Sequence, residues 1–227
     1  MPADPSSFWT ALRDAEVDVA ALQEVRFPAS GQIGELAQAA ERAGLPHIAF
    51  YPLSAACFRE DELSGLALLS RHPFRNKQQA KLPNPGLSHE RNGTIQTSYD
   101  KGLLSAVLDR NGHSVRVVSL HAPPFHRFGR APDEFGSIWA ALAASIGTLD
   151  DLPLLVGGDF NTGRRELLTE HVNWRLHQAI GDRKTHFDKA TDDILYTDAF
   201  ELVNSRVIET QSDHALCLAE FEPVSGP

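Results

Sequence analysis

Apolar and polar positions follow two rhythms along the chain, one typical of strands and one typical of helices. Apolar runs predict buried strands at residues 18–25, 63–70 and 152–158, and strict alternation predicts another at residues 47–53. Amphipathic stretches predict helices at residues 6–16, 31–44, 135–149 and 164–180. Ser6 and Ser7 are suited to cap the first helix, and Gly44 is suited to end the second. Strands that alternate with helices indicate a domain of the α/β type.

The remaining segments are predicted as a hairpin, an excursion and late strands. Two alternating runs joined by Asp109-Arg110-Asn111-Gly112 predict a hairpin over residues 101–124. Residues 75–101 are polar and rich in Pro and Gly, and we expect a long excursion there with a strand at its end. Late strands are predicted within residues 192–203 and 205–222. No repeat or linker marks a boundary, so residues 1–227 are expected to form a single domain.

Composition and charge limit the classes of partner that this domain can bind. Of the 227 residues, 42% are hydrophobic and 22% are charged, which is enough for one domain with a substantial core. A formal net charge of -9 repels nucleic acid, so a polyanionic substrate needs a local basic strip or a bound metal ion. The start lacks the features of a signal peptide, and no apolar run of about 18 residues occurs. We therefore expect a cytoplasmic protein with no membrane partner, in which Cys57 and Cys217 are buried thiols rather than a disulfide.

Side chains that suit catalysis stand where the apolar runs begin or end. Each has an ordinary explanation by itself: Glu24 as a solvated edge, His121 as a loop residue, Asp159 as a turn cap, and His214 as a half-buried histidine. Together, such acids and histidines form the set that metal-assisted phosphoryl chemistry needs. Hard divalent cations prefer carboxylate oxygens, the attacking water must be positioned, and histidine suits proton transfer.

Six segments carry a resemblance to a known family. In order along the chain they are LQEV, GLALLSRHPF, VVSLHAPPF, LLVGGDFNTG, DDILYT and QSDHALCLAEF. They resemble the endonuclease/exonuclease/phosphatase superfamily, the DNase I-like fold, over about residues 8–222; GDFN followed by SDH is the most specific pair. The resemblance implies a four-layer α/β/β/α sandwich. It also implies a hydrolase of phosphate esters, most often phosphodiesters, that depends on Mg²⁺ or Mn²⁺.

The resemblance also implies which residues hold the metal and the water. Glu24 would be the main metal ligand, and Asp213 would help to hold the ion directly or through water. Asp159 would lie at the metal and would orient or deprotonate the attacking water. Asn161 would donate its amide to the phosphate from the same side as Asp159, provided that the chain stays extended.

The histidines and a further acid complete the implied site. His214 would contact the phosphate and help to activate the water, and Asp192 would fix the tautomer of His214. His121 would serve as a general acid or a phosphate ligand. Asp193 stands where the family usually has Tyr, His or Trp, and is the weaker candidate of the two neighbouring acids.

Glycines and basic residues near these motifs have two interpretations each. Gly157 and Gly158 are expected to leave room for the ion or the scissile phosphate, although relief of packing between the sheets would also explain them. Arg127 and Arg164 are candidates for substrate binding, and Arg164 and Arg165, directly after GDFNTG, could reach a leaving group or a neighbouring phosphate. Ordinary solvated loop charge explains each arginine equally well.

One departure from the family pattern bears on stability and function. Members usually open with a strand that ends in an Asn, whereas residues 8–25 here correspond to the first helix and the second strand. A start codon upstream, a late beginning of the chain, and a protein that does without the strand are three open explanations. An absent inner strand would leave an unpaired sheet edge, so we expect lower stability than in a complete relative.

Two functions therefore follow from the sequence. The first is a metal-dependent phosphodiesterase acting on a phosphodiester such as DNA or RNA, with a small-molecule phosphatase as its variant. The second is a weakly active or non-catalytic binding domain of the same fold. The physiological substrate, the number of metal ions and the oligomeric state stay open.

Overall fold

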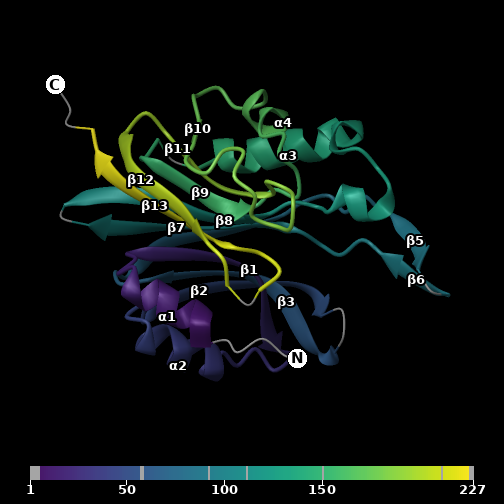
Figure 1. Ribbon diagram of the computed structural model, residues 1–227, viewed down its shortest axis with the longest axis horizontal. Helices are drawn as coiled ribbons and strands as arrows, with labels where there is room; N and C mark the ends of the chain where they lie inside the picture. Colours follow the sequence, from purple (N-terminus) through teal and green to yellow (C-terminus); the bar gives the residue numbers. More distant parts are fainter. Residues whose placement is uncertain are drawn as a thin grey trace.

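The computed structural model describes residues 6–56, 59–91, 93–110, 112–149, 151–210 and 212–224. Two β-sheets lie face to face, and helices cover their outer faces (Figure 1). Helices α1 (Ser6–Asp14) and α2 (Gly34–Arg42) lie against the outer face of one sheet. Helices α3 (Gly136–Gly147) and α4 (Glu166–Thr169) cover the other sheet. The predicted four-layer α/β/β/α arrangement is thus confirmed.

The larger sheet has six strands in the order β10-β11-β9-β8-β7-β4. Its central strands are β7 (Gly102–Arg110), β8 (His113–His121) and β9 (Leu154–Asp159). The flanking strands are β4 (Phe74–Lys81), β10 (His177–Gln178) and β11 (Asp192–Tyr196). Strands β7 and β8 form the hairpin that the alternation predicted, and β8 and β9 are parallel because α3 connects them.

The facing layer consists of two ladders. Strands β1 (Val19–Pro28), β3 (Arg59–Ser70) and β2 (His47–Ala56) form an antiparallel sheet in the order β1-β3-β2. Strands β12 (Phe200–Ile208) and β13 (Leu216–Pro223) pair with each other. Within the described residues, β1 has a ladder partner only on its β3 side and β13 only on its β12 side. The expectation about a strand before α1 falls outside the described residues, which begin at Ser6.

Burial on both faces explains why the sequence of β3 is a continuous apolar run. Along β3, Leu66 and Leu68 face the larger sheet and pack among residues such as Leu104, while Ala67 and Leu69 face the helices. Successive side chains of a strand point to opposite faces, so a strand buried on both faces needs apolar residues at every position. Every residue of β3 from Gly65 to Ser70 is buried for this reason.

Two predictions of local structure were wrong in part. Residues 75–101 hold more strand than the predicted excursion with one strand at its end: β4 forms an edge of the larger sheet, and β5 (Ser88–Arg91) pairs with β6 (Thr94–Thr97). Their polarity reflects exposed strands, since β4 is largely solvated and β6 fully so. Residues 164–180 are helical only in α4, because the chain then returns to the sheet as β10 to pair with β11.

One of the two cysteines, Cys217, lies within the described residues. Cys217 is half-buried, and burial raises the pKa of its thiol to about 12, so it stays protonated at neutral pH. Cys57 lies outside the described residues, as does Asn111 in the predicted turn.

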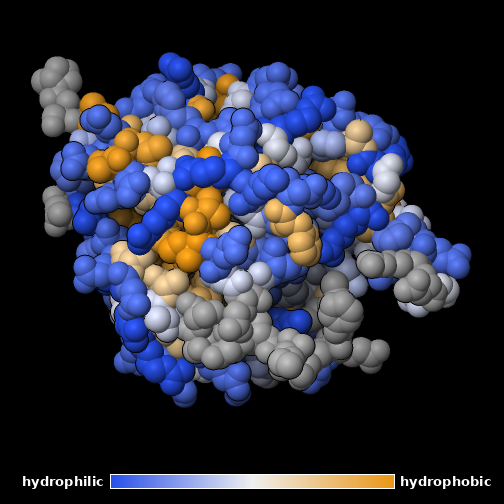
Figure 2. Space-filling model, in the orientation of Figure 1, coloured by the Kyte–Doolittle hydropathy of each residue, from blue (hydrophilic) through white to orange (hydrophobic). Residues whose placement is uncertain are grey.

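No helix in the described part of the chain is long and apolar enough to cross a membrane. The surface of one face is mostly hydrophilic, with apolar side chains gathered beside β13 (Figure 2).

Candidate active site

Three adjacent strands bring their polar ends together. The parallel register of β8 and β9 sets His121 opposite Asp159, and the antiparallel register of β9 and β11 sets Asp192 opposite Asp159. The three residues therefore form a row at one end of the larger sheet. All three are buried, with 4%, 6% and 9% of their surface exposed. Buried polar groups at strand ends are rigidly positioned, which suits a catalytic site.

A histidine from the loop before β13 closes this row. The Nδ1 atom of His214 lies 2.9 Å from Oδ2 of Asp192 and 3.1 Å from Oδ1, and Thr191 donates a hydrogen bond to the same carboxylate. Burial by itself would lower the pKa of His214, but Asp192 and the charges of Asp159 and Asp213 outweigh it and raise the pKa to about 9. At neutral pH, His214 is an imidazolium whose Nε2 is directed away from Asp192.

Asp159 is ionised despite its burial. Burial favours its neutral form, yet the hydrogen bond with His121 and the charge of His214 hold the pKa below its ordinary value. Its Oδ1 accepts a 2.7 Å hydrogen bond from the backbone N–H of Asn161, and Oδ2 lies 3.4 Å from Nε2 of His121. Burial and Lys101 lower the pKa of His121, so its ring is neutral and suits hydrogen bonding better than acid catalysis.

Asn161 reaches the site by a different route from the predicted one. The strand ends at Asp159, and Asn161 has φ 53°, so the chain turns there instead of staying extended. Its Nδ2 donates a 2.8 Å hydrogen bond to the carbonyl of Ala122, which fixes the orientation of the amide. A left-handed conformation in a non-glycine residue costs energy and is frequent at functional sites.

Glu24 lies across the sheet interface, next to a buried lysine that sequence reasoning did not select. A bulge interrupts β1 between Leu22 and Val25, where Glu24 has φ 53°. Its Oε1 lies 3.3 Å from Nζ of Lys101 and 3.9 Å from Nε2 of His121. Desolvation opposes ionisation of Glu24, although 66% of its side chain is exposed, but the ammonium of Lys101 prevails and lowers its pKa. The sequence signal for Lys101 was its place at the head of the apolar run that forms β7.

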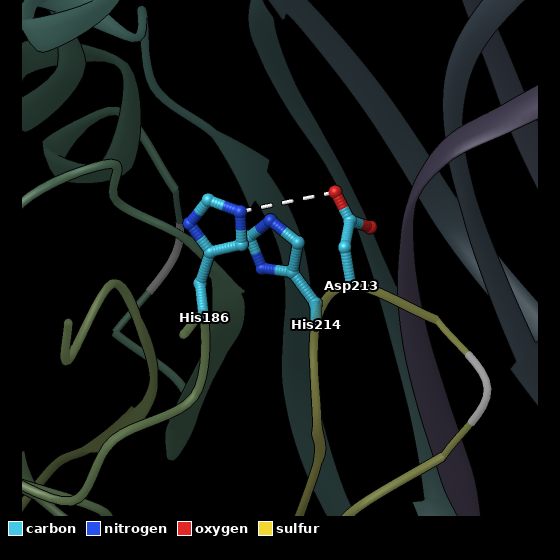
Figure 3. Close-up of side chains that lie close together, drawn as sticks. All are labelled: His186, Asp213 and His214. Carbon is cyan, nitrogen blue, oxygen red and sulfur yellow. Dashed lines mark ion pairs between the residues drawn. The ribbon is translucent and has the colours of Figure 1, made fainter. Parts of the chain in front are cut away.

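A second residue missed in the sequence is His186. Its ring stacks on that of His214 with centroids 4.2 Å apart and an interplanar angle of 13°. Its Nε2 lies 3.8 Å from Oδ2 of Asp213, and Figure 3 shows the three side chains together. Burial and the charge of His214 lower the pKa of His186, so a neutral ring lies against the imidazolium. No strand end marks His186, and the sequence carried no signal for it.

Two groups of side chains have a donor set that fits a divalent cation. One comprises Asp159, Asp192 and His214, and the other comprises His186, Asp213 and His214; within each, the ligand atoms lie within 4.8 Å of one another. The carboxylate oxygens of these groups suit Mg²⁺ or Mn²⁺, whereas a neutral imidazole nitrogen suits a softer cation such as Zn²⁺. Among the described residues, Glu24 belongs to neither group, and its nearest cation is the ammonium of Lys101.

The arginines near the site divide into surface and interior groups. Arg164 is half exposed and pairs with Glu166 at 2.9 Å and with Asp133 at 3.3 Å. Arg127 is exposed in the 3₁₀ turn Phe125–Phe128, and its charge contributes to the lowered pKa of Glu24. Arg165, in contrast, is only 1% exposed and pairs with Asp193. Arg165 is therefore not placed to reach a leaving group.

The preferred explanation of the two glycines was wrong. A Cβ atom at Gly157 would lie 3.1 Å from that of Ala21 in the facing sheet. A Cβ atom at Gly158 would lie 2.2 Å from the carbonyl oxygen of Leu120 on β8. Both positions are small because neighbouring backbone and the opposite sheet approach closely. Packing, rather than clearance for an ion, explains them.

The sequence and the fold were compared with known proteins. The sequence matches the Endonuclease/Exonuclease/phosphatase family over residues 2–214. No match was found among curated proteins.

Solved structures share the fold at low sequence identity. An endonuclease/exonuclease/phosphatase from Beutenbergia cavernae is 19% identical with a TM-score of 0.70, over 97% of this chain and 66% of that one, slightly under two thirds of its length. The human Nocturnin catalytic domain with bound sulfate is 16% identical, with a TM-score of 0.67 over 96% of this chain and 86% of that one. The 3' phosphatase NExo from Neisseria, bound to a product DNA hairpin, is 16% identical, with a TM-score of 0.61 over 96% and 93%.

Family and fold together indicate a phosphoester hydrolase of the nuclease or phosphatase type. The chain belongs to the endonuclease/exonuclease/phosphatase family.

Proposed function

We propose that this chain is a divalent-metal-dependent phosphodiesterase that cleaves nucleic acid strands. The observation that carries the proposal is an ionised Asp159 close to a protonated His214, in a cluster with Asp192 whose ligand atoms lie within 4.8 Å of one another. Hydrolysis of a phosphodiester needs a base for the attacking water and a cation for the phosphoryl oxygens. Asp159 offers the base and His214 offers the cation, within a single cluster.

Asp159 orients the attacking water and accepts its proton. The hydrogen bond from the backbone of Asn161 to Oδ1 fixes the carboxylate, and Oδ2 is directed toward His121. A carboxylate with a lowered pKa is ionised at neutral pH and can accept a hydrogen bond from the attacking water. The side-chain amide of Asn161, held by the carbonyl of Ala122, has its second N–H left to donate to the phosphate.

His214 stabilises negative charge on the phosphoryl group. Asp192 holds its Nδ1, so Nε2–H is the donor that a non-bridging oxygen meets. With a pKa of about 9, the ring is a poor base at neutral pH and acts as a fixed cation instead. Neutral His121, whose Nε2 faces Oδ2 of Asp159, helps to hold that carboxylate in place.

Glu24, Asp213 and Asp159 are the residues that would hold a Mg²⁺ or Mn²⁺ ion. Such an ion neutralises charge on the phosphate and lowers the pKa of bound water. Four acids, Glu24, Asp159, Asp192 and Asp213, gather around the site, and a cation would offset their mutual repulsion.

A nucleic acid strand is the substrate class that the surroundings favour. The Neisseria neighbour was solved with a product DNA hairpin, which supports the same class here. A shallow cavity of about 220 Å³ adjoins the site and is lined by Asn161, Thr162, Lys189 and Thr191, among others. Arg127 and Lys189 provide positive charge at its margins, which an acidic protein needs in order to hold a phosphate backbone.

The test is a Mg²⁺ or Mn²⁺ titration with plasmid DNA, single-stranded oligonucleotides and bis(p-nitrophenyl) phosphate. Asp159→Ala and His214→Ala should each lower kcat by roughly 10²- to 10⁴-fold. Asp198→Ala is the matched control, because Asp198 also pairs with a histidine, His177, but at an exposed site. Cleavage of none of the substrates, or equal activity in all variants, would refute the mechanism.

A further inference from the structure

A tight turn next to the site holds an aromatic side chain in solvent. The backbone N–H groups of Thr185 and His186 donate to the carbonyl of Lys189, and the N–H of Lys189 donates to the carbonyl of His186. These three hydrogen bonds close a small loop whose tip is Phe187 and Asp188. The loop is attached to the strand that carries His214, since the N–H of Ala215 donates a 2.7 Å hydrogen bond to the carbonyl of Thr185.

Phe187 does not contribute to the core. It is 78% exposed, more than any other large apolar side chain in the described part of the chain. Its φ of 52° lies in the left-handed region, which a bulky aromatic residue rarely adopts. Exposure loses the benefit of burial, and the backbone conformation costs energy as well. Such a combination persists where the surroundings impose it, and strained residues cluster at ligand sites.

The position of the ring connects it to the candidate active site. The centroids of Phe187 and His186 are 4.6 Å apart, and His186 stacks in turn on His214 at 4.2 Å. Figure 3 shows His186 and His214 side by side, with Asp213 beyond them. Lys189, at the other end of the turn, lines the cavity next to Asn161. One short turn thus presents an aromatic face and a cation on two sides of the same site.

We propose that Phe187 is a stacking platform for an unpaired nucleobase next to the scissile phosphate, with Lys189 facing the neighbouring phosphate. The inference rests on the proposed function and adds the substrate class, a strand with a free base. An exposed aromatic ring gives each base a surface to stack on regardless of sequence, and a nearby cation follows the backbone. A paired base in a duplex hides its faces, so single-stranded or frayed ends are preferred.

The test compares two single-stranded oligonucleotides of equal length. One carries ordinary bases and the other carries abasic tetrahydrofuran residues, so that both have the same phosphate backbone. Binding is measured by fluorescence anisotropy, and KM is measured with Mg²⁺ or Mn²⁺. The variants are Phe187→Ala, Phe187→Leu and Phe187→Trp. Val203→Ala is the control, because Val203 is 50% exposed on β12, away from the end of that strand that pairs with Leu216 near His214.

Loss of a stacked base is expected to change affinity by about ten-fold. Wild type should bind the base-bearing strand about ten-fold more tightly than the abasic strand, and Phe187→Ala and Phe187→Leu should remove that preference. Phe187→Trp and Val203→Ala should keep it. An equal preference in wild type and Phe187→Ala, or no preference in wild type, overturns the proposal. Failure of the proposed function would show differently, as absence of cleavage by a protein that still binds the base-bearing strand preferentially.

Discussion

Removal of Asp193 should destabilise the protein strongly, because it leaves a buried arginine without its counter-charge. The side chains of Arg165 and Asp193 are 1% and 0% exposed. Burial lowers the pKa of Arg165 and raises that of Asp193, so the interior opposes both charges and only the pairing makes them tolerable. Asp193 also accepts hydrogen bonds of 2.9 and 2.8 Å from the backbone N–H groups of Ile180 and Ile194.

The magnitude follows from what each substitution leaves behind. Asp193→Ala leaves the guanidinium with only the carbonyls of Thr162, Ala190 and Asp192 and the face of Phe160. Breaking a buried pair in this way costs about 3–5 kcal/mol. With a urea m value of about 3 kcal/mol/M, the unfolding midpoint should fall by roughly 1–1.7 M. The double variant Arg165→Met/Asp193→Leu should recover most of this loss, since apolar replacement of both partners is often neutral.

Urea unfolding followed by tryptophan fluorescence measures these differences in EDTA, which removes any contribution from metal. Asp198→Ala is the control for a surface pair, because Asp198 is 70% exposed and its pair with His177 should contribute less than about 1 kcal/mol. A cost below about 1 kcal/mol for Asp193→Ala would refute the reasoning. Loss of cleavage by a fully stable Asp193→Ala protein would do the same, since it would assign Asp193 to the chemistry instead of the interior.

Three further predictions concern the site itself. In EDTA, protonated His214 should contribute about 2–3 kcal/mol to the free energy of unfolding, because its pKa is raised in the folded state. This contribution is fully present below the unfolded pKa near 6.5 and should be lost as pH rises through about 9. Asp192→Asn should flatten that pH dependence of urea unfolding; an unchanged slope would contradict the assignment. Addition of Mg²⁺ or Mn²⁺ should raise Tm, because a metal that binds the native state adds about 2.7 kcal/mol to the free energy of unfolding at a hundred-fold excess over Kd. Glu24→Gln should reduce this shift in Tm. Lys101→Met should raise the pKa of His121 in an NMR titration, because the ammonium of Lys101 helps to lower it; an unaltered or lower pKa would count against the buried contact.

The residues at strand ends could be predicted because local pattern and position agree there. A polar side chain that borders a buried apolar run lies near an end of a strand: His121 and Asp159 follow such runs, and Asp192 precedes one. Their roles as site residues stay predictions, but their proximity follows from the observed registers. The four layers were predictable for the same reason, since apolar periodicity determines which face of each element is buried.

Residues in loops could not be predicted, because contacts distant in sequence determine their positions. His186 reaches His214 only because the turn that carries it is bonded to Ala215, thirty residues after Thr185. Solvated loop charge was one of the two interpretations of Arg165, and Lys101 was not selected, yet both are buried against acids that lie far away in the sequence. Charged residues are rarely buried unless they are paired, and a single sequence does not reveal the partner.

The register of β8, β9 and β11 connects the packing of the fold to its chemistry. Successive side chains of a strand alternate between faces, so a slip of one residue would turn Asp159 from the row with His121 and Asp192 toward the other face. Gly158 allows β9 to approach the carbonyl of Leu120, and Gly157 allows it to approach Ala21 of the facing sheet. A side chain at either position would push β9 away from its neighbours. The glycines that precede Asp159 therefore serve the site indirectly, because they fix the strand in the only register that aligns the three polar ends.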